Sequence, residues 1–471
     1  VCHHKVSTYF GGHLMHQSTQ KQKVQGNSRL RWTEGVASPG FIMLATRKGR
    51  TSVDKARPFN ISKREVWLAY KRVRENRGAA GVDDQTIAEF EKDLSNNLYR
   101  LWNRMSSGSY MPPPVRRVDI PKGDGRGTRP LGIPTVSDRI AQMVVKRYLE
   151  PVLEPVFHDD SFGYRPGRSA HDAVAAARQR CWRFDWVLDL DIKGFFDNID
   201  WELLMRAVRR HIDCAWVLLY IERWLKAPVS MPDGALVSRE KGTPQGAVVS
   251  PILANLFLHY AFDRWMKENN PDIPFERYAD DAICHCRSEA QALSLRQALE
   301  ARLAACKLEL HPQKTKIVYC KDSNRPNGYP KQRFDFLGFT FRPRQSMNRA
   351  GKLFVSFSPA VSDKAAKVMR EDVRRWQLHH RNDLDLEKIA QWARPILVGW
   401  VNYYGRFHRS ALRRALRTVD PFIVRWAQRK YKRLRGHAKR AWGWLRGVKS
   451  RQPNLFAHWS TKSPVGAIGA G

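Results

Sequence analysis

The sequence predicts a mixed α+β region followed by an all-α region, and three observations lead to this expectation. Short apolar runs with strand character, such as 186–192 and 275–286, alternate with segments of helical spacing in the first three quarters of the chain. After about Ser358 the strand pattern stops, and apolar residues recur at helical spacing from Ala365 to Trp400. The chain has 471 residues, 42% of them hydrophobic, which is enough for about three packed domains. An α+β class with a separate helical domain fits all three observations.

Ordered structure is expected to begin near Ser62, where apolar residues take up helical spacing and continue to a glycine-rich end. The dense prolines and glycines between 110 and 134 predict a hairpin whose tip carries Lys122, Arg126 and Arg129. The expected elements of the mixed region are strands at 115–120, 131–133, 186–192 and around Tyr278, and helices at 137–154 and after Trp201. The tail, 461–471, is low in complexity and is expected to be flexible.

Charge sets this chain apart from an average globular protein. Lys and Arg number 82 against 45 Asp and Glu, a net charge of +37, and nucleic acid is the natural counter-ion for such a surplus. Residues 1–55 hold nine Lys or Arg against two acids with no sustained hydrophobic period, which predicts a basic N-terminal arm that is partly disordered. Residues 401–450 hold fifteen Lys or Arg against Asp420 alone, interleaved with aromatic residues. A solvated charged face usually carries both signs, so this stretch favours binding to a phosphate backbone.

Cysteines and apolar stretches exclude several classes of protein. The seven cysteines form no C-x-x-C pair, so neither a zinc finger nor a disulfide scaffold is indicated, and a reduced cytosolic setting fits best. Cys284 and Cys286 alternate with apolar neighbours and are expected to be buried strand thiols. The longest apolar stretch, 247–262, is interrupted by a proline, an asparagine and a histidine, so we expect a buried helix there and no membrane span.

Two adjacent acids, Asp280 and Asp281, interrupt an apolar run of strand character. Neighbouring carboxylates in such a place repel each other and lose hydration, so fold stability gives little reason to keep them, whereas a site for divalent cations gains from them. Phosphoryl transfer with two cations needs carboxylates from more than one strand. The end of an earlier strand offers Asp189 or Asp191, and strand alternation places both on one face, so spacing leaves the choice open. Mg²⁺, a hard ion that prefers oxygen ligands, is the expected metal.

Three motifs carry a family resemblance. They are Asp-Ile-Lys-Gly-Phe-Phe-Asp at 191–197, Gly-Thr-Pro-Gln-Gly-Ala-Val-Val-Ser-Pro at 242–251 and Tyr-Ala-Asp-Asp at 278–281. In this order and spacing they resemble the reverse transcriptases encoded by group II introns, and the resemblance covers about 65–459. A further stretch, 394–407, resembles the signature of the thumb or maturase domain, which separates the intron-encoded group from retroviral-type enzymes.

The resemblance implies a right-hand polymerase fold with a maturase domain. It places the reverse transcriptase fingers and palm at 56–345, and an all-α thumb or maturase (X) domain with a basic C-terminus that binds RNA and DNA at 346–460. Many relatives continue into a zinc-containing H-N-H nuclease domain, whereas this sequence ends soon after Trp459. We therefore expect no self-encoded DNA nicking and a primer that comes from elsewhere, such as a replication fork.

The resemblance also implies roles for individual residues of the polymerase site. Asp191, Asp280 and Asp281 would be catalytic and metal-binding, with Ile192 beside them in the metal site. The nucleotide-binding residues would be Lys122, Arg129, Phe196 and Gln245. Contact between Phe196 and the incoming sugar would reject a ribose 2′-hydroxyl, so the product would be DNA.

Further positions follow from the same resemblance outside the nucleotide pocket. The primer grip would be formed by Leu337 and Gly338, within the hairpin 334–341. The loop 163–168 resembles a family motif near the template path. The RNA-binding residues would be Arg406, Arg425, Arg429, Lys430, Lys432 and Arg433.

Plainer roles stay open for several residues. Phe196 alone would be a core aromatic, and Gln245 alone a turn residue. Asp197 and Asp200 are expected to cap the following helix rather than to bind metal. Lys314 is expected either to approach the active site or to be a solvated lysine.

The implied cofactors are two Mg²⁺ ions, for which Mn²⁺ can substitute. The implied partners are a group II intron RNA, held as a ribonucleoprotein, target DNA and deoxynucleoside triphosphates, with no membrane, and the implied location is the bacterial cytoplasm or nucleoid. The protein would be an RNA-directed DNA polymerase and maturase that assists splicing and reverse-transcribes its intron during retrohoming. Two alternatives stay open: a non-catalytic RNA-binding splicing cofactor, and a domesticated relative in host DNA repair or defence. The sequence also leaves the oligomeric state open.

Overall fold

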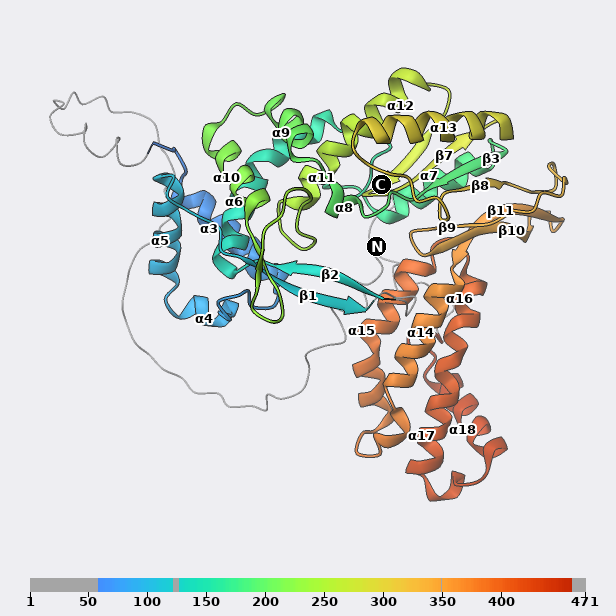
Figure 1. The fold of residues 1–471 in the computed structure, drawn as a ribbon. Coiled ribbons are helices and arrows are strands. Elements are labelled where there is room, and N and C mark those ends of the chain that lie inside the picture. The colour runs from blue at the N-terminus through green and yellow to red at the C-terminus, as the bar shows by residue number, and fades with distance from the viewer. Residues whose placement is uncertain (1–57, 122–126, 349, 460–471) are drawn as a thin grey trace, which may run out of the picture.

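The computed structural model describes residues 58–121, 127–348 and 350–459, so the basic arm, Lys122, Arg126 and the tail lie outside the described residues. Three parts are visible in Figure 1: helices with a long hairpin on the left, a second sheet with helices beside it at the upper right, and a group of helices that projects below that sheet. The predicted order, mixed α+β followed by helices, is confirmed.

The first part joins four helices to a long hairpin. Its elements are α3 (Lys63–Asn76), α4 (Ile87–Lys92), α5 (Leu94–Ser106), α6 (Val136–Leu153), β1 (Val115–Pro121) and β2 (Thr128–Ile133). Ser62, Thr86 and Thr135 cap α3, α4 and α6, because each side-chain oxygen accepts a hydrogen bond from the backbone N–H three residues further on. Two short strands, β4 (Val229–Ser230) and β5 (Leu236–Val237), extend the sheet in the order β2-β1-β4-β5. The hairpin predicted around 121–130 is therefore present.

The second part is an antiparallel sheet in the order β6-β7-β3-β8. Its strands are β3 (Trp186–Leu190), β6 (Phe275–Tyr278), β7 (Asp281–Cys286) and β8 (Lys316–Tyr319). Alternate residues of β3 enter two different cores: Trp186, Leu188 and Leu190 pack in the first, and Val187 packs in the second. Cys284 and Cys286 are fully buried in the first core, as expected for strand thiols.

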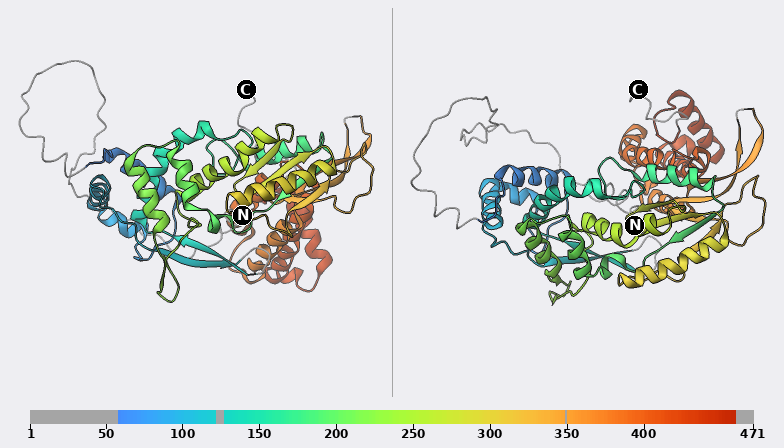
Figure 2. Two further views of the ribbon diagram at one scale, coloured as in Figure 1. Left: turned by 45° about the horizontal axis from the view of Figure 1, so that its top comes forward. Right: turned by 90° about the horizontal axis from the view of Figure 1, so that it is seen from above.

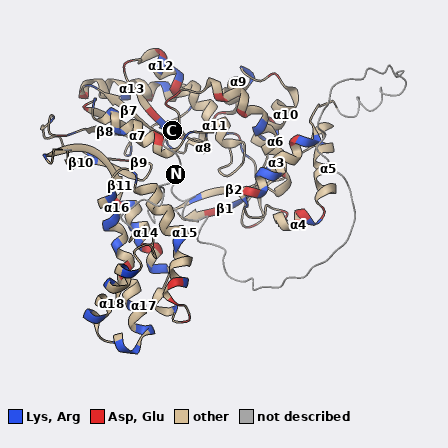
Figure 3. Cartoon of the chain, turned by 180° about the vertical axis from the view of Figure 1, so that it is seen from behind, with Lys and Arg blue, Asp and Glu red and all other residues tan. Residues whose placement is uncertain are grey.

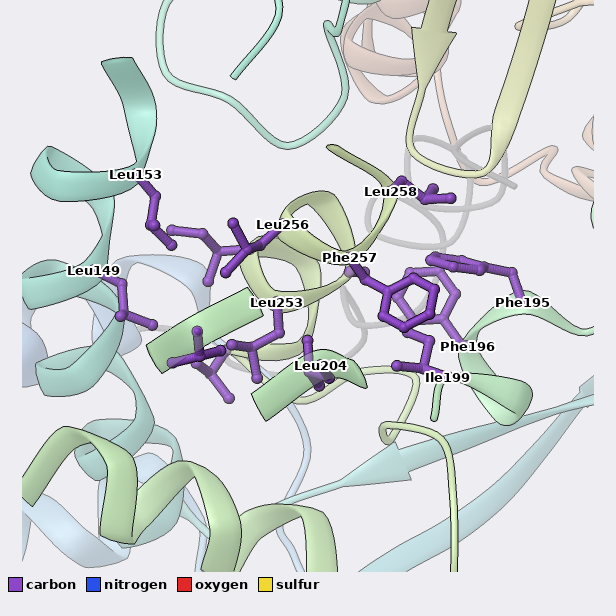
Figure 4. Packing of buried hydrophobic residues seen from close by; sticks show 14 of the residues in the cluster. Leu149, Leu153, Phe195, Phe196, Ile199, Leu204, Leu253, Leu256, Phe257 and Leu258 are labelled. Atoms are coloured by element: carbon purple, nitrogen blue, oxygen red, sulfur yellow. The ribbon is translucent and has the colours of Figure 1, made fainter. Parts of the chain in front are cut away.

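Further helices come from residues 170–305, and the first and the last of them pack against this sheet. They are α7 (Ala170–Cys181), α8 (Phe195–Asn198), α9 (Trp201–Arg209), α10 (Ala215–Lys226), α11 (Ser250–Leu258), the π-helical turn η2 (His259–Asp263), α12 (Arg264–Asn269) and α13 (Glu289–Ala305). Figure 4 shows α11 between α6 and α8, with Leu256 toward Leu153 and Phe257 beside Phe195 and Phe196. The stretch 247–262 is therefore a buried helix, as predicted. Within the described ranges, every helix is too short or too polar to cross a lipid bilayer.

A three-stranded sheet leads into the third part. Its strands, in the order β11-β10-β9, are β9 (Phe334–Phe336), β10 (Phe339–Met347) and β11 (Leu353–Val361). Figure 2 shows the β10–β11 hairpin extending away from the body of the protein. The helices that follow are α14 (Asp363–Arg375), α15 (Leu386–Tyr404), α16 (Arg409–Leu416), α17 (Asp420–Lys430) and α18 (Ala438–Arg451). Short 3₁₀ turns are η1 (Glu154–Val156), η3 (Leu378–His380), η4 (Arg417–Val419) and η5 (Lys432–Leu434). Helical structure thus begins at Asp363, and the start of the span 346–460 is strand.

Asp420 fixes the C-terminal segment to α17. Its buried carboxylate accepts hydrogen bonds from Lys449 Nζ at 2.6 Å, Trp459 Nε1 at 2.9 Å and His458 Nε2 at 3.1 Å. Burial alone would raise the pKa of this carboxyl, but the donors outweigh burial and lower the pKa of Asp420 to about 2. The single acid of this basic region is therefore structural.

Asp420→Asn is expected to lower the free energy of unfolding by about 2 kcal/mol near neutral pH. The folded pKa of Asp420 lies below its ordinary value, so the stabilisation is present above about pH 4 and is lost as the pH falls toward 2. The difference in melting temperature between wild type and variant should shrink on acidification. The exposed Asp383→Asn is a matched control, and equal destabilisation by both variants near neutral pH would contradict this role.

Candidate active site

The two adjacent acids lie at the tip of the β6–β7 hairpin. Tyr278 pairs with Asp281 in the strand register, so Ala279 and Asp280 form the turn between the strands. Ala279 has a φ of +58°, a left-handed conformation that residues other than glycine rarely adopt. The strand expected around Tyr278 is present and ends in this turn, with Asp280 in the turn and Asp281 as the first residue of β7.

Asp191 reaches the same place from β3. Leu190 pairs with Ala282 of β7, so the next residue on β3 lies beside the start of β7. The backbone of Asp191 is fixed by the N–H of His311, which donates to its carbonyl at 2.7 Å. Lys314 Nζ lies 3.3 Å from Asp191 Oδ2 while its side chain stays 61% exposed, so this lysine both approaches the acids and is solvated. Ile192 forms a bridge with Leu310 and buries its side chain, which leaves its main-chain carbonyl as the group that could face a metal.

The three carboxyl groups influence one another. Burial, together with the charges of the nearby Asp280 and Asp191, raises the pKa of Asp281 to about 6. Burial also raises the pKa of Asp280, with Asp191 acting in the same direction. Asp280 Oδ1 is buried without a hydrogen-bond partner. Carboxylates that are desolvated and repel each other in this way are stabilised when a cation binds between them.

The structure also separates Asp189 from Asp191. Asp189 lies within the sheet, paired with Ile283 on one side and Lys316 on the other. Burial, and next the charge of Asp281, raise the pKa of Asp189 to about 8. A carboxyl with that pKa is largely protonated at neutral pH and is a poor ligand. The open end of β3 therefore favours Asp191 as the metal ligand.

The residues present fit a magnesium site that is completed by substrate. In the described ranges no three His, Cys, Asp or Glu side chains converge closely enough to form a complete metal cage. Mg²⁺ is usually held by one or two carboxylates together with substrate phosphates and water, so a full protein cage is not required. The unpartnered Oδ1 of Asp280 and the raised pKa values of Asp280 and Asp281 are what such a partial site presents before its metal binds.

The nucleotide-binding candidates from the hairpin and from 242–251 meet in space. Arg129 Nε, on β2, donates to Gln245 Oε1 at 2.5 Å. Gln245 Nε2 in turn donates to both carboxylate oxygens of Asp197 at 3.3 Å. Gly242 comes so close to α8 that an added Cβ would lie 2.7 Å from the carbonyl oxygen of Asp197. Arg129, Gln245 and α8 therefore form one cluster, while Lys122 lies outside the described residues.

Phe196 and Asp200 match the plainer roles expected for them, and Asp197 does not. Phe196 is 7% exposed and packs against Phe195 with ring centroids 5.3 Å apart, so it is a core aromatic as well as a neighbour of the Gln245 cluster. Asp200 caps α9, as predicted, by accepting the N–H of Leu203 at 2.9 Å. Asp197 does not cap that helix: it lies inside α8, and its carboxylate faces Gln245. The place of Asp197 at the end of the 191–197 motif was the sequence signal that could have indicated its contact with Gln245.

The predicted primer grip is a tight turn between β9 and β10. Leu337 has a φ of +49° and Gly338 a φ of +76°, as the central residues of a type I′ turn require. The carbonyl of Leu337 accepts a hydrogen bond from Tyr403 Oη at 2.9 Å, and the carbonyl of Gly338 accepts one from the N–H of Ser362 at 2.9 Å. The turn is therefore held by α15 and by the start of α14.

The predicted RNA-binding residues lie on the outer surface of the helical part, where Lys and Arg gather on α17 and α18 (Figure 3). The exposed members are Arg406, Arg425, Arg429, Lys430, Lys432 and Arg433. Two of them also donate hydrogen bonds to backbone carbonyls: Arg429 to that of His379 at 3.3 Å, and Lys430 to that of Asn382. Lys432 and Arg433 stand on the turn η5 and present their charge to solvent.

Comparison with known proteins identifies both halves of the chain. The family description "reverse transcriptase (RNA-dependent DNA polymerase)" matches residues 120–341, and "group II intron, maturase-specific domain" matches 366–442. The group II intron-encoded protein LtrA of Lactococcus lactis subsp. cremoris is 36% identical over 423 aligned residues, which cover 72% of this chain and 68% of that protein. Protein YkfC of Escherichia coli (strain K12) is 33% identical over 279 residues, 51% of this chain and 73% of that protein.

A telomerase from Candida albicans, solved with a TWJ fragment of telomeric RNA, aligns over 80% of this chain and 64% of its own at 11% identity and a TM-score of 0.41, a likeness too weak to carry an argument. The two matched descriptions follow the order of the fold: the sheets with the acidic turn come first, and the basic helices follow. The likeness to LtrA covers 72% of this chain, more than either description matches alone. The family predicted from the three motifs is confirmed. This chain belongs to the group II intron-encoded reverse transcriptases that carry a maturase domain, and it is an RNA-directed DNA polymerase.

Proposed function

We propose that this protein binds a group II intron RNA as a ribonucleoprotein, assists the splicing of that RNA and copies it into DNA during retrohoming. The observation that carries the proposal is the union, in one chain, of an acidic turn suited to metal-assisted nucleotidyl transfer with a cationic helical surface that has a single acid. We further propose the bacterial cytoplasm or nucleoid as its location, fingers and palm at 56–345, and the thumb or maturase domain at 346–460.

In the proposed polymerase site, Asp191, Asp280 and Asp281 hold Mg²⁺, with the carbonyl of Ile192 beside them. When bound, two such ions activate the primer 3′-hydroxyl and stabilise the charge on the leaving pyrophosphate. Lys314, 3.3 Å from Asp191, balances part of the acidic charge and keeps that side chain oriented. A further cluster of residues would select the incoming nucleotide.

That cluster is Arg129 with Gln245, Phe196 and Asp197. Lys122, outside the described residues, stays a further candidate from the sequence. Arg129 would turn its remaining guanidinium donors to the triphosphate, because arginine is suited to paired contacts with phosphate oxygens. Gln245, held between Arg129 and Asp197, would line the nucleotide pocket. Phe196 is anchored in the core, so its ring cannot retreat from a 2′-hydroxyl, which supports DNA as the product. Leu337 and Gly338 would hold the primer end, since the turn is fixed on both sides.

Contact with intron RNA is proposed for the surface of α17, η5 and α18. Structured RNA is recognised largely through its shape and its phosphates, and cationic helices with aromatic neighbours suit both. Arg429 and Lys430 are anchored to backbone carbonyls and so present their remaining donors from fixed positions. Arg425 lies over the Phe422 ring, with 5.3 Å from its guanidinium carbon to the ring centroid, which keeps it extended along the helix.

Charge reversal on this surface tests the proposal. The double variant Lys432→Glu/Arg433→Glu is expected to weaken binding of the flanking intron RNA and to flatten the dependence of log K on log salt by roughly 1–2. Filter binding or fluorescence anisotropy over a salt series measures both quantities. Lys267→Glu/Arg296→Glu, on α12 and α13, makes the same change of net charge away from the surface. Equal affinity and an unaltered slope in the η5 variant would remove this surface from RNA binding.

The alternatives are separated by two further observations. A search of the DNA that flanks the gene for the domains of a group II intron RNA decides between retrohoming and a role in host DNA repair or defence. Splicing assistance without any detectable cDNA would favour a non-catalytic cofactor, against which the intact Asp191, Asp280 and Asp281 argue.

A further inference from the structure

Arg277, the residue directly before the Tyr-Ala-Asp-Asp turn, is 1% exposed and uses its whole guanidinium group inside the protein. Nε and Nη2 donate to the two carboxylate oxygens of Asp263, both at 2.6 Å. Nη2 also donates to Ser161 Oγ at 2.7 Å, and Nη1 donates to Asn255 Oδ1 at 3.0 Å. The remaining bond runs from Nη1 to the carbonyl oxygen of Ala279, at 2.9 Å.

The bond to Ala279 reaches the catalytic turn itself. The carbonyl of Ala279 and the N–H of Asp280 belong to one planar peptide unit. A hydrogen bond that fixes this carbonyl therefore also fixes the Cα of Asp280, from which its side chain projects. Ala279 holds a φ of +58°, and a non-glycine residue stays in that region only where its surroundings enforce it. The guanidinium of Arg277 is such a restraint, because it is itself held at every other donor.

The other partners of Arg277 come from one continuous helical run and from a loop. Asp263 is the last residue of the π-helical turn η2, and π-helical turns often occur where a functional site needs a side chain redirected. Asn255 lies two turns earlier on α11 and also donates to the carbonyl of Gly163 at 2.6 Å. Ser161 belongs to the loop that pairs with β6. A helix and a loop therefore converge on one guanidinium of β6, which connects both of them to the turn.

We propose that Arg277 and Asp263 are positioning residues for nucleotidyl transfer: together they form a buried clamp that holds the Ala279–Asp280 peptide so that Asp280 and Asp281 face the metal. The proposal rests on the proposed magnesium site. A buried ion pair is often replaceable by an apolar pair without loss of stability, so stability alone does not account for this arrangement. Orientation of the catalytic turn does account for it, because the Arg277 guanidinium that pairs with Asp263 also donates to the carbonyl of Ala279 in that turn.

Arg277→Lys is the first test. Lysine keeps one charge for Asp263, but it is a point charge and cannot bond both Asp263 oxygens, Asn255 and Ala279 together. The rate constant kcat for primer extension is expected to fall about 100-fold, as for a small misplacement of reacting groups. The Mg²⁺ concentration for half-maximal activity is expected to rise about 10-fold, as when an outer-shell residue of a metal site is changed. The KM for nucleotide and the affinity for primer and template should change little.

The double variant Arg277→Met/Asp263→Leu controls for the case in which Arg277→Lys loses activity only because it fails to fold. This double variant removes both buried charges, so it leaves no unpaired ion and is expected to keep a melting temperature near that of wild type. Hydrogen–deuterium exchange gives a readout without catalysis: the amides of 278–282 should exchange faster in both variants, while those of β3 should not.

Arg325→Lys is the matched control. Arg325 is also largely buried, donates to the carbonyls of Phe184 at 2.7 Å and Cys181 at 2.9 Å, and pairs with Asp322, but it lies at the opposite end of the sheet from the acidic turn. Its replacement should lower stability without changing the Mg²⁺ midpoint. The clamp is overturned if Arg277→Lys and Arg325→Lys give the same kinetics, or if exchange in 278–282 is unchanged in the Arg277 variants. If wild type itself shows no Mg²⁺-dependent extension, the proposed metal site fails, whereas the exchange result still decides whether Arg277 holds the turn.

Discussion

Asp280→Ala is expected to reduce primer extension on an RNA template by about 1,000-fold or more. Stabilisation of transition-state charge by a bound metal is worth several kcal/mol, and each 1.4 kcal/mol is a factor of ten in rate. Asp280 carries the buried Oδ1 that lacks a hydrogen-bond partner, so its loss removes the ligand that has the most to gain from a cation. Steady-state extension over a Mg²⁺ series measures the effect.

The same variant should leave the fold and the RNA surface intact. Burial raises the pKa of Asp280, so the ionised carboxylate is held in the folded protein at a cost when metal is absent. Alanine removes that cost, and the melting temperature without metal should not fall. Affinity for intron RNA should be unchanged, since the charges on α17 and α18 are untouched. Asp272→Ala, an exposed acid just before β6, is the control; full activity in the Asp280 variant would refute the assignment of the site.

Local patterns predict the acidic turn and the end of β3 well, because both depend on alternation along a single strand. The choice between Asp189 and Asp191 is different in kind. Both share a face of β3, and only the pairing of Asp189 with Ile283 and Lys316 inside the sheet separates them. Sheet register depends on contacts between distant segments, so sequence spacing alone left that choice open.

The Gln245 cluster and the clamp on the turn were also beyond local patterns. Asp197 was wrongly predicted to be a helix cap, because an acid before a helix is the usual cap, yet α8 is a separate short helix that contains it. Its contact with Gln245 joins positions 48 residues apart. The π-helical turn at Asp263 adds a residue to a helix without any mark in the apolar pattern, so its bond to Arg277 appears only in three dimensions.

Gly163→Ala is expected to disable the polymerase by moving the acidic turn. A Cβ at Gly163 would lie 2.3 Å from the backbone nitrogen of Ala279 and 2.9 Å from the carbonyl carbon of Tyr278. These are backbone atoms, which cannot swing aside as the end of a side chain can, so the loop and the turn must separate. We expect kcat to fall about 100-fold and the free energy of unfolding to fall by about 1–3 kcal/mol.

The kinetic constant that changes in Gly163→Ala distinguishes a displaced turn from a role of this loop in template binding. If Gly163 mattered because its loop contacts the template, the alanine variant would mainly raise the KM for primer and template; a displaced turn instead lowers kcat and raises the Mg²⁺ requirement. Gly328→Ala is the control, since a Cβ there meets no atom within 4 Å. Activity and melting temperature near wild type in Gly163→Ala would mean that the loop yields without moving the turn, and the close approach of the two backbones would then have no part in catalysis.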